Sequence, residues 1–283
     1  MTTPENTIAY QGVPGAYSNL ACKSAYPDMV ASPNPSFEDM LAQVTNGHAK
    51  YAMVPVENSV AGRVADIHHL LPSSGLYIVG EHFQRVNHQL LGVKGATLDD
   101  LKEIHSHAQG LAQCRNTLNS LNLTPIMHSD TAGAAADVAA AGDKSVGAIA
   151  SSLAAEIYGL DILKANAEDL EHNTTRMLVM AKEPVMPPKD NGPVITTLIF
   201  SLRSVPAALY KSLGGFATNG INLTKLESYM VGGHFSAAQF YIDAECHQDS
   251  DAFRFALEEL KFYTVDGSIQ ILGSYEASAQ RRV

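Results

Sequence analysis

Polar side chains that can bind a small molecule or move a proton adjoin three apolar runs of this chain. One run ends in Glu57 and Asn58, a second ends at Ser106, and a third begins just after Thr175 and Arg176. A carboxyl group can transfer a proton, amide and hydroxyl groups can orient a ligand, and a guanidinium group can hold a carboxylate through two parallel hydrogen bonds. Because open α/β sheets bind ligands at the carboxyl ends of their strands, these junctions predict one shared cleft.

Each junction also has an ordinary structural explanation. The first fits a helix cap and loop, and an arginine at a strand edge is usually a surface ion-pair partner. The helix that opens after Ser106 offers free backbone N–H groups, which suit a carboxylate. His105 and His107 resemble part of a metal site, but no third ligand lies nearby in the sequence, so surface or packing roles are favoured for them.

Motifs for several other chemistries are missing. The turn at Gly12–Gly15 follows the first expected strand, but it is neither G-x-G-x-x-G nor a P-loop, and the chain has no G-x-S-x-G. Cys22, Cys114 and Cys246 are odd in number, widely spaced and without a C-x-x-C, which argues against a disulfide framework or a cysteine-built zinc site. The sequence predicts neither a cofactor nor a metal.

The composition is that of a folded, acidic protein. Its 283 residues carry 19 Lys+Arg and 29 Asp+Glu, so the net charge is 19 − 29 = −10. Hydrophobic residues make up 46% and charged residues 17%, which excludes wholesale disorder, and the acidic balance disfavours nucleic acid as a partner. The N-terminus lacks a signal-peptide pattern, and no apolar run reaches the roughly 18 residues of a membrane span. We therefore expect a cytoplasmic protein with a small-molecule ligand and no membrane partner.

Strand-like and helix-like runs alternate through the first two thirds of the chain, which predicts parallel sheets covered by helices. Crossings near 80–93 and 165–176 predict two lobes with a cleft between them. Four prolines and a glycine within 184–193 exclude regular structure and predict an interdomain linker. The division then falls into domains 1–183 and 194–283, in keeping with the roughly 150 residues of an average domain.

The pattern after the linker is different. We expect, in order, a strand, a helix, two hairpin strands across Gly232-Gly233, a helix capped by Asp249 or Ser250, and a closing strand. This βαββαβ order predicts a ferredoxin-like unit of about 80 residues. Because it contains no obvious catalytic cluster, it is expected to regulate or assemble the protein.

Five ordered segments resemble the monofunctional bacterial prephenate dehydratases with a C-terminal ACT domain. They are Tyr10–Ser18, Val54–Ser59, Ser106–Cys114, Asn173–Arg176 and, in the ACT part, Gly220–Ser228. The resemblance covers nearly the whole chain, and several motifs in order are more specific than any one of them. It implies a two-lobed catalytic domain like the type II periplasmic binding proteins, followed by a ferredoxin-like ACT domain.

The resemblance also implies an activity, the decarboxylating dehydration of prephenate to phenylpyruvate, water and carbon dioxide in phenylalanine biosynthesis. Thr175 and Arg176 match the family's Thr-Arg-Phe signature, in which the threonine is essential. The other cleft residues carried over by motif are Glu57, Asn58, Ser106 and Gln113. We expect Arg176 and the N–H groups after Ser106 to bind the substrate carboxylates, and Thr175 to donate to the departing hydroxyl. Glu57, if protonated, is the candidate acid, and the two amides are expected to orient the substrate.

The ACT resemblance implies binding of L-phenylalanine between chains of a homodimer or homotetramer. The implied effector residues are Asn222, Leu223, Glu227, Ser228, Ala208 and Leu209. The family's Glu-Ser-Arg-Pro reads Glu-Ser-Tyr229-Met230 here, so the sign of the response stays open. The catalytic signature departs at Met177, a volume-tolerant apolar exchange for phenylalanine.

Three other functions remain as alternatives. Arogenate dehydratase performs the same chemistry on the amino-acid form of the side chain, and the motifs do not discriminate between the two substrates. A non-catalytic amino-acid sensor is disfavoured by the retained Thr175, Arg176, Glu57 and Asn58. A transport binding protein is disfavoured by the missing signal peptide.

Overall fold

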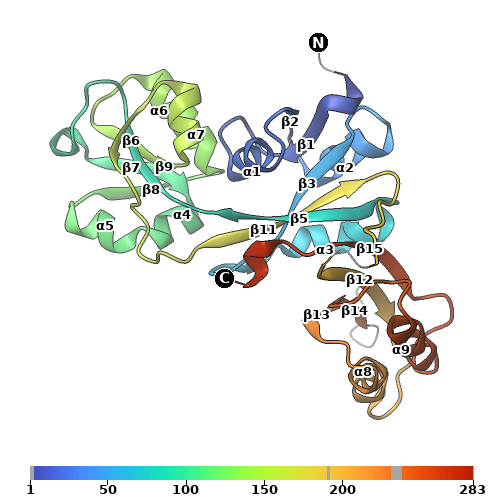
Figure 1. Ribbon diagram of the computed structural model, residues 1–283. Helices are drawn as coiled ribbons and strands as arrows, with labels where there is room; N and C mark the ends of the chain where they lie inside the picture. Colours follow the sequence, from blue (N-terminus) through green and yellow to red (C-terminus); the bar gives the residue numbers. More distant parts are fainter. Residues whose placement is uncertain (1–2, 190–191, 231–237, 283) are drawn as a thin grey trace. The chain divides into compact units, whose positions relative to one another are not determined.

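The computed structural model describes residues 3–189, 192–230 and 238–282, which form an α/β protein with three sheets (Figure 1). Contacts group the chain into two compact units. The first unit is Met1–His68 with His82–Met177, and the second is His69–Glu81 with Leu178–Val283. No helix within the described ranges is long and apolar enough to span a membrane.

The first sheet has the strand order β2-β1-β3-β11-β5, with β4 paired to β3. Its strands are β1 Thr7–Gln11, β2 Val30–Asn34, β3 Tyr51–Asn58, β4 Gly62–Arg63, β5 Tyr77–Arg85 and β11 Thr174–Ala181. The accompanying helices are α1 Tyr17–Ala25, α2 Phe37–Thr45 and α3 Ala65–Leu70. β1 lies parallel to both β2 and β3. Ser36 caps α2 through the Asp39 N–H, and the apolar face of α2 packs on β1 and β3.

The second sheet has the order β10-β6-β9-β7-β8. Its strands are β6 Gln89–Gly92, β7 Glu103–His107, β8 Thr124–His128, β9 Val146–Ala150 and β10 Asp161–Lys164. The helices are α4 Ala108–Gln113, α5 Arg115–Ser120, α6 Thr131–Ala141 and α7 Ser152–Tyr158. β7 is parallel to β8 and β9, whereas β6 is antiparallel to β9 and β10, so the sheet is mixed. The small residues of α6 allow it to pack closely on β7 and β9.

The chain passes between these two sheets twice, once between β5 and β6 and again between β10 and β11. The extended stretch expected near residues 80–93 is therefore two strands, each belonging to a different sheet.

The third sheet has the order β13-β14-β12-β15, and every pair is antiparallel. Its elements are β12 Val194–Ser201, α8 Ala208–Thr218, β13 Leu223–Met230, β14 Ala238–Ala244, α9 Asp251–Lys261 and β15 Gln270–Glu276. This is the predicted βαββαβ order, and Ser250 is the cap of α9, accepting from the Phe253 N–H. The predicted turn at Gly232-Gly233 lies outside the described residues.

One face of the third sheet is apolar and is covered by α8 and α9, with Phe200, Phe216 and Phe253 in its core. Segment 69–81 lies against the sheet's other side, because a Cβ added at Gly273 would collide with the carbonyl of Ile78.

A buried charged cluster lies on this side of the second unit. The Arg281 guanidinium holds Glu81 through two bonds, Nε to Oε1 at 2.6 Å and Nη2 to Oε2 at 2.9 Å, and its Nη2 also lies 3.3 Å from Asp243 Oδ2. Both carboxylate side chains are 0% exposed. Asp243 in turn accepts a hydrogen bond from Thr197.

Candidate functional site

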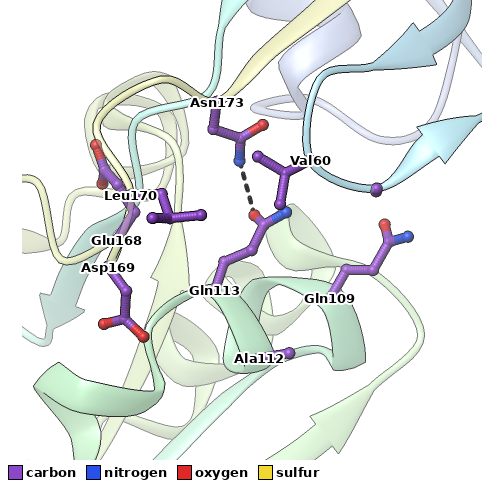
Figure 2. Close-up of a pocket in the computed structure, with 9 residues that line it drawn as sticks. Val60, Gln109, Ala112, Gln113, Glu168, Asp169, Leu170 and Asn173 are labelled. Carbon is purple, nitrogen blue, oxygen red and sulfur yellow. Dashed lines mark hydrogen bonds between the residues drawn. The ribbon is translucent and has the colours of Figure 1, made fainter.

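A cleft of about 280 Å³ in the first unit is lined by residues from both of its sheets. The lining residues are Tyr17, Ser18, Pro55, Asn58, Val64, Val86, His88, His107, Gln109, Gly110, Gln113, Asp130, Thr131, Asn173, Thr175 and Met177. An adjoining chamber of about 460 Å³, with the apolar side chains of Val60, Ala61, Ala112 and Leu170 in its wall, is shown in Figure 2. The cleft and the chamber share Gln109, Gln113 and Asn173, so the last two side chains stand between them.

The orientation of the Asn58 amide is fixed by the backbone at the end of β3. Its Oδ1 accepts from the N–H groups of Val60 at 3.0 Å and Ala61 at 2.8 Å. The NH₂ group must therefore point the other way, where it donates to Asn173 Oδ1 at 2.7 Å and to Thr175 Oγ1 at 3.0 Å. Asn58 thus connects the end of β3 to the start of β11.

The network continues from β11 into the second sheet's helices. Asn173, which is 2% exposed, donates through its Nδ2 to Gln113 Oε1 at 2.8 Å, the dashed contact in Figure 2. His88 Nε2 lies 2.8 Å from the same Gln113 oxygen. His88 Nδ1 in turn lies 2.9 Å from the Tyr17 hydroxyl, which is also 2.8 Å from the carbonyl oxygen of Asn87.

Burial determines the protonation states of His88 and Tyr17. It lowers the pKa of His88 below its usual value, and the opposing effects of the Gln113 hydrogen bond and the Glu168 charge are smaller. Burial likewise raises the pKa of Tyr17 well above its usual value, with smaller contributions from Cys114 and Glu168. Both groups are therefore neutral at pH near 7, and the whole network is uncharged.

Two donors of this network are left for a ligand. Thr175 Oγ1 accepts from Asn58, and no other described residue accepts the Thr175 proton. Gln113 uses its oxygen for His88 and Asn173, and Figure 2 shows its nitrogen on the side of Val60 and Gln109. Both residues line the cleft, and Gln113 also lines the chamber, so the Thr175 hydroxyl and the Gln113 NH₂ group remain for a ligand of these cavities.

Glu57 and Arg176 form an ion pair and line neither cavity, with Arg176 Nη1 3.2 Å from Glu57 Oε1. The Arg176 side chain is only 3% exposed. Successive side chains of a strand point to opposite faces, so Arg176 is directed away from the face that carries Thr175.

Ser106 is fully buried and donates to the carbonyl oxygen of Ile149 at 2.7 Å, so it too lines neither cavity. The glycine at position 110 allows α4 to lie close to Ser106, since a Cβ at Gly110 would lie 2.9 Å from Ser106 Oγ. One amide of the first turn of α4 is already bonded, because His107 Nδ1 accepts the Gln109 N–H at 3.3 Å.

Of the six residues predicted for the site, the structure therefore brings Asn58, Gln113 and Thr175 together. Sequence reasoning missed Tyr17, His88 and Asn173 as members of the network. Tyr17 and Asn173 lie inside motifs that the sequence did single out, and that position was a usable signal. His88 lies in a crossing segment with no local motif.

The start of α1 borders the cleft. The cap of this helix is Ala16, and Ser18 lies in the first turn. Just before the helix, Asn19 Oδ1 accepts the Gly15 N–H. Ala16 makes no capping hydrogen bond through its side chain, and Tyr17 and Ser18 of the first turn line the cleft.

Among the described residues that line the cleft, none is a lysine or an arginine. A carboxylate placed there would meet the first turn of α1 and the hydroxyl and amide donors of the lining. The described residues also contain no group of three His, Cys, Asp or Glu side chains that could hold a metal ion.

Comparison with known proteins gives a consistent result. The family described as "PDT: Prephenate dehydratase" matches residues 8–185, more than half of the chain. A protein of Komagataeibacter europaeus named "Bifunctional N-acyl-homoserine lactone acylase/prephenate dehydratase" is 50% identical over 98% of this chain and 98% of its own. "Arogenate dehydratase/prephenate dehydratase 1, chloroplastic" of Arabidopsis thaliana is 40% identical over 95% of this chain and 71% of its own.

A solved structure supports the same assignment. Prephenate dehydratase of Arthrobacter aurescens in complex with L-Phe is 29% identical, with a TM-score of 0.87 over 97% of this chain and 91% of its own. Together with the family match and the relatives above 30% identity, this agreement shows that the chain belongs to the prephenate dehydratase family.

Proposed function

We propose that the cleft of the first unit converts prephenate to phenylpyruvate, water and carbon dioxide. The observation that carries this proposal is the Thr175 hydroxyl. It accepts a hydrogen bond from the backbone-anchored Asn58 amide, and its own proton remains for a ligand in the cleft. A hydroxyl that accepts one hydrogen bond donates more strongly, because bonded groups polarise one another.

The reaction needs little from the protein. The bond from the ring to its carboxylate breaks, and its electron pair enters the ring as carbon dioxide leaves. The bond from the ring to its hydroxyl oxygen breaks, this oxygen takes up a proton from solvent and leaves as water, and the ring becomes aromatic. A hydrogen bond from Thr175 to the departing oxygen stabilises the charge that develops there, an effect worth on the order of 10²–10⁴ in rate for a positioned donor.

The two carboxylates of the substrate are held by neutral donors in this scheme. The first turn of α1 with Ser18 supplies one group of donors, and the NH₂ of Gln113 supplies another. Helix N-termini stabilise anions without a formal positive charge. The Arg176–Glu57 pair acts from behind the cleft by joining β11 to β3, and this supports a positioning role rather than direct contact with the substrate.

The choice between prephenate and arogenate is open to a direct test. Purified protein is supplied with each substrate, and formation of phenylpyruvate or phenylalanine is followed to obtain kcat/KM for both. We expect prephenate to be preferred, because the amide and hydroxyl donors of the lining can bond the keto oxygen of its side chain, where arogenate carries an ammonium group. A kcat/KM higher for arogenate would reassign the substrate, and no turnover of either would favour the sensor alternative.

The C-terminal βαββαβ part is, in this proposal, an ACT domain that binds L-phenylalanine. Its expected effector residues are Asn222, Leu223, Glu227, Ser228, Ala208 and Leu209. The supporting observations are the element order and the relative of 29% identity that was solved with L-Phe. The functional division stays as predicted from the sequence, with a two-lobed, binding-protein-like catalytic domain over 1–183, a linker over 184–193 and the ACT domain over 194–283.

Tyr229 is the position at which the effector motif departs from the family. Its ring packs edge-on against His69 at 5.4 Å, within the second unit, and the side chain is 6% exposed. Titration of L-phenylalanine by calorimetry, with activity and size-exclusion measurements in parallel, tests binding, the sign of the response and dimer against tetramer together. Absence of binding at millimolar ligand would refute an intact regulatory site.

A second activity is favoured by the apolar chamber beside the cleft. The relative from Komagataeibacter is named as an N-acyl-homoserine lactone acylase in addition to a dehydratase. The chamber of about 460 Å³ presents Val60, Ala112 and Leu170, which suit an acyl chain better than a dianion. Release of fatty acid from an N-acyl-homoserine lactone, reduced by Leu170→Glu, would support it. No release would leave the chain monofunctional, as its sequence predicts.

A further inference from the structure

We propose that His88, held by Tyr17, is a positioning residue for the dehydration: it fixes the Gln113 side-chain amide with its NH₂ group directed to the substrate. The kinetic consequence of this inference rests on the proposed function. The geometry that carries it is a chain of hydrogen bonds whose direction is set by the backbone.

The direction is determined at Asn58 and transmitted one side chain at a time. Backbone N–H groups bind Asn58 Oδ1, so its NH₂ group faces Asn173. The Asn173 oxygen must then be the acceptor, and its nitrogen is left to donate to Gln113. A flipped Gln113 would place NH₂ against NH₂ at 2.8 Å, so its oxygen takes that position.

The same oxygen determines the tautomer of His88. Gln113 Oε1 is an acceptor only, and His88 Nε2 lies 2.8 Å from it, so Nε2 must carry a proton. In the neutral ring, Nδ1 is then an acceptor, and the Tyr17 hydroxyl at 2.9 Å is the donor that faces it, with its single proton shared with the Asn87 carbonyl oxygen at 2.8 Å. Tyr17 thus orients His88, and His88 gives the Gln113 oxygen a second donor besides Asn173.

This second donor matters because a single hydrogen bond leaves a glutamine side chain free to rotate. With both bonds made, the Gln113 oxygen is fully occupied and its NH₂ group alone is available to the cleft. If the side chain turned, its carbonyl oxygen would face an anionic substrate, which it cannot bind. Loss of His88 should therefore weaken substrate binding, while leaving the Thr175 hydroxyl in place.

The kinetic test compares wild type with His88→Leu, His88→Gln and Tyr17→Phe. We expect His88→Leu to raise KM for prephenate about 10-fold, the usual cost of one hydrogen bond of about 1.4 kcal/mol, with kcat changed less than about 3-fold. His88→Gln keeps an N–H donor and should restore most of the wild-type KM, and Tyr17→Phe should raise KM less than His88→Leu. A role in folding alone would lower the active fraction, and hence kcat, at unchanged KM.

A double-mutant cycle with Gln113→Leu separates action through Gln113 from direct contact with the substrate. If His88 acts through Gln113, His88→Leu adds nothing to the KM of Gln113→Leu. Additive effects on KM, or an unchanged KM in His88→Leu, would overturn the proposal.

The tautomer gives a readout that does not depend on activity. The ¹⁵N shifts of the His88 ring in the ligand-free protein should show a protonated Nε2 and an unprotonated Nδ1. The opposite tautomer would overturn the proposed orientation of Gln113 even in an active enzyme. An inactive wild type with the expected tautomer would instead contradict only the proposed function.

Discussion

The two units bury polar groups in opposite ways. In the first unit, Asn58, Asn173, Gln113 and His88 form a chain of uncharged groups that ends at a cleft. In the second, Arg281 joins two fully buried carboxylates, and the Arg281 side chain itself is 13% exposed. The first network leaves two donors unused, whereas in the second one guanidinium is shared by two carboxylates.

This difference follows from the cost of removing a charge from water. A neutral amide network needs only hydrogen-bond partners, so it can leave a hydroxyl and an NH₂ group for a ligand at modest cost. A buried ion pair is tolerated only when its partners satisfy one another, and removal of one partner is expensive. The neutral network therefore suits a binding site, and the ionic one suits a fixed joint between segment 69–81 and the third sheet.

The largest expected effect comes from breaking the ionic cluster. Arg281→Met leaves the Glu81 and Asp243 carboxylates without their guanidinium, and we expect the free energy of unfolding to fall by about 3–5 kcal/mol. The chain has no tryptophan, so urea unfolding is best followed by far-UV circular dichroism.

Arg254→Met is the matched control. Arg254 pairs with Asp251 and Glu258 on the surface of α9, with 54% of its side chain exposed, and its removal should change stability far less. Equal losses in the two variants would show that the cluster of Arg281 is no more important than a surface pair.

Disruption of the uncharged network in the first unit should lower turnover rather than stability. Asn58→Asp keeps the acceptor for Val60 and Ala61, so the fold should hold, but it cannot donate to Thr175. The Thr175 proton would then turn to the new carboxylate, and we expect kcat to fall about 100-fold. Asn119→Asp, at an exposed position of α5, controls for the added charge. Similar kcat values for the two variants would argue against the role of Asn58.

Ser106 tests whether a buried hydrogen bond near the cleft is structural. Because Ser106 donates to Ile149 and lines neither cavity, Ser106→Ala should lower the free energy of unfolding by about 1 kcal/mol and leave KM unchanged. Ser120→Ala removes an exposed hydroxyl and serves as the control. A raised KM at unchanged stability would return Ser106 to the substrate contacts that its motif implied.

The smallest expected effect is a pH dependence of stability. Burial lowers the pKa of His88 in the folded protein, so the unfolded chain binds more protons as the pH falls below about 6.5. The contribution of His88 is therefore fully present above that pH and decreases on acidification. The titratable groups that face it are Tyr17 and Glu168. Between about pH 7.5 and about pH 5.5, the free energy of unfolding should fall more for wild type than for His88→Gln. Equal falls in the two proteins would exclude His88 as the source of this pH dependence.

Much of the fold was predictable because its strands are apolar and its turns carry strong signals. β3 and β11 are runs of buried side chains with polar ends, and α9 begins at a serine that caps it. β2 was missed because it contains Pro33 and side chains of mixed burial, and because its regularity comes from pairing with β1. A pairing partner in another part of the chain leaves no local pattern.

The site was predictable only in part, for a related reason. Strand alternation places Thr175 and Arg176 on opposite faces, but the sequence does not say which face borders the cleft. His88 has its partners at sequence separations of 71 and 25 residues, so no motif contains the group. Motifs identified the segments, and the tertiary structure selected among their side chains.

The most direct test of the account is the turnover of prephenate by Thr175→Ala and Thr175→Ser. The account predicts that phenylpyruvate formation by Thr175→Ala has a kcat at least about 100-fold below that of the wild type, because the donor to the departing hydroxyl is lost. Thr175→Ser keeps that donor and should stay within about 10-fold of the wild type. Near wild-type turnover by Thr175→Ala would contradict the central claim.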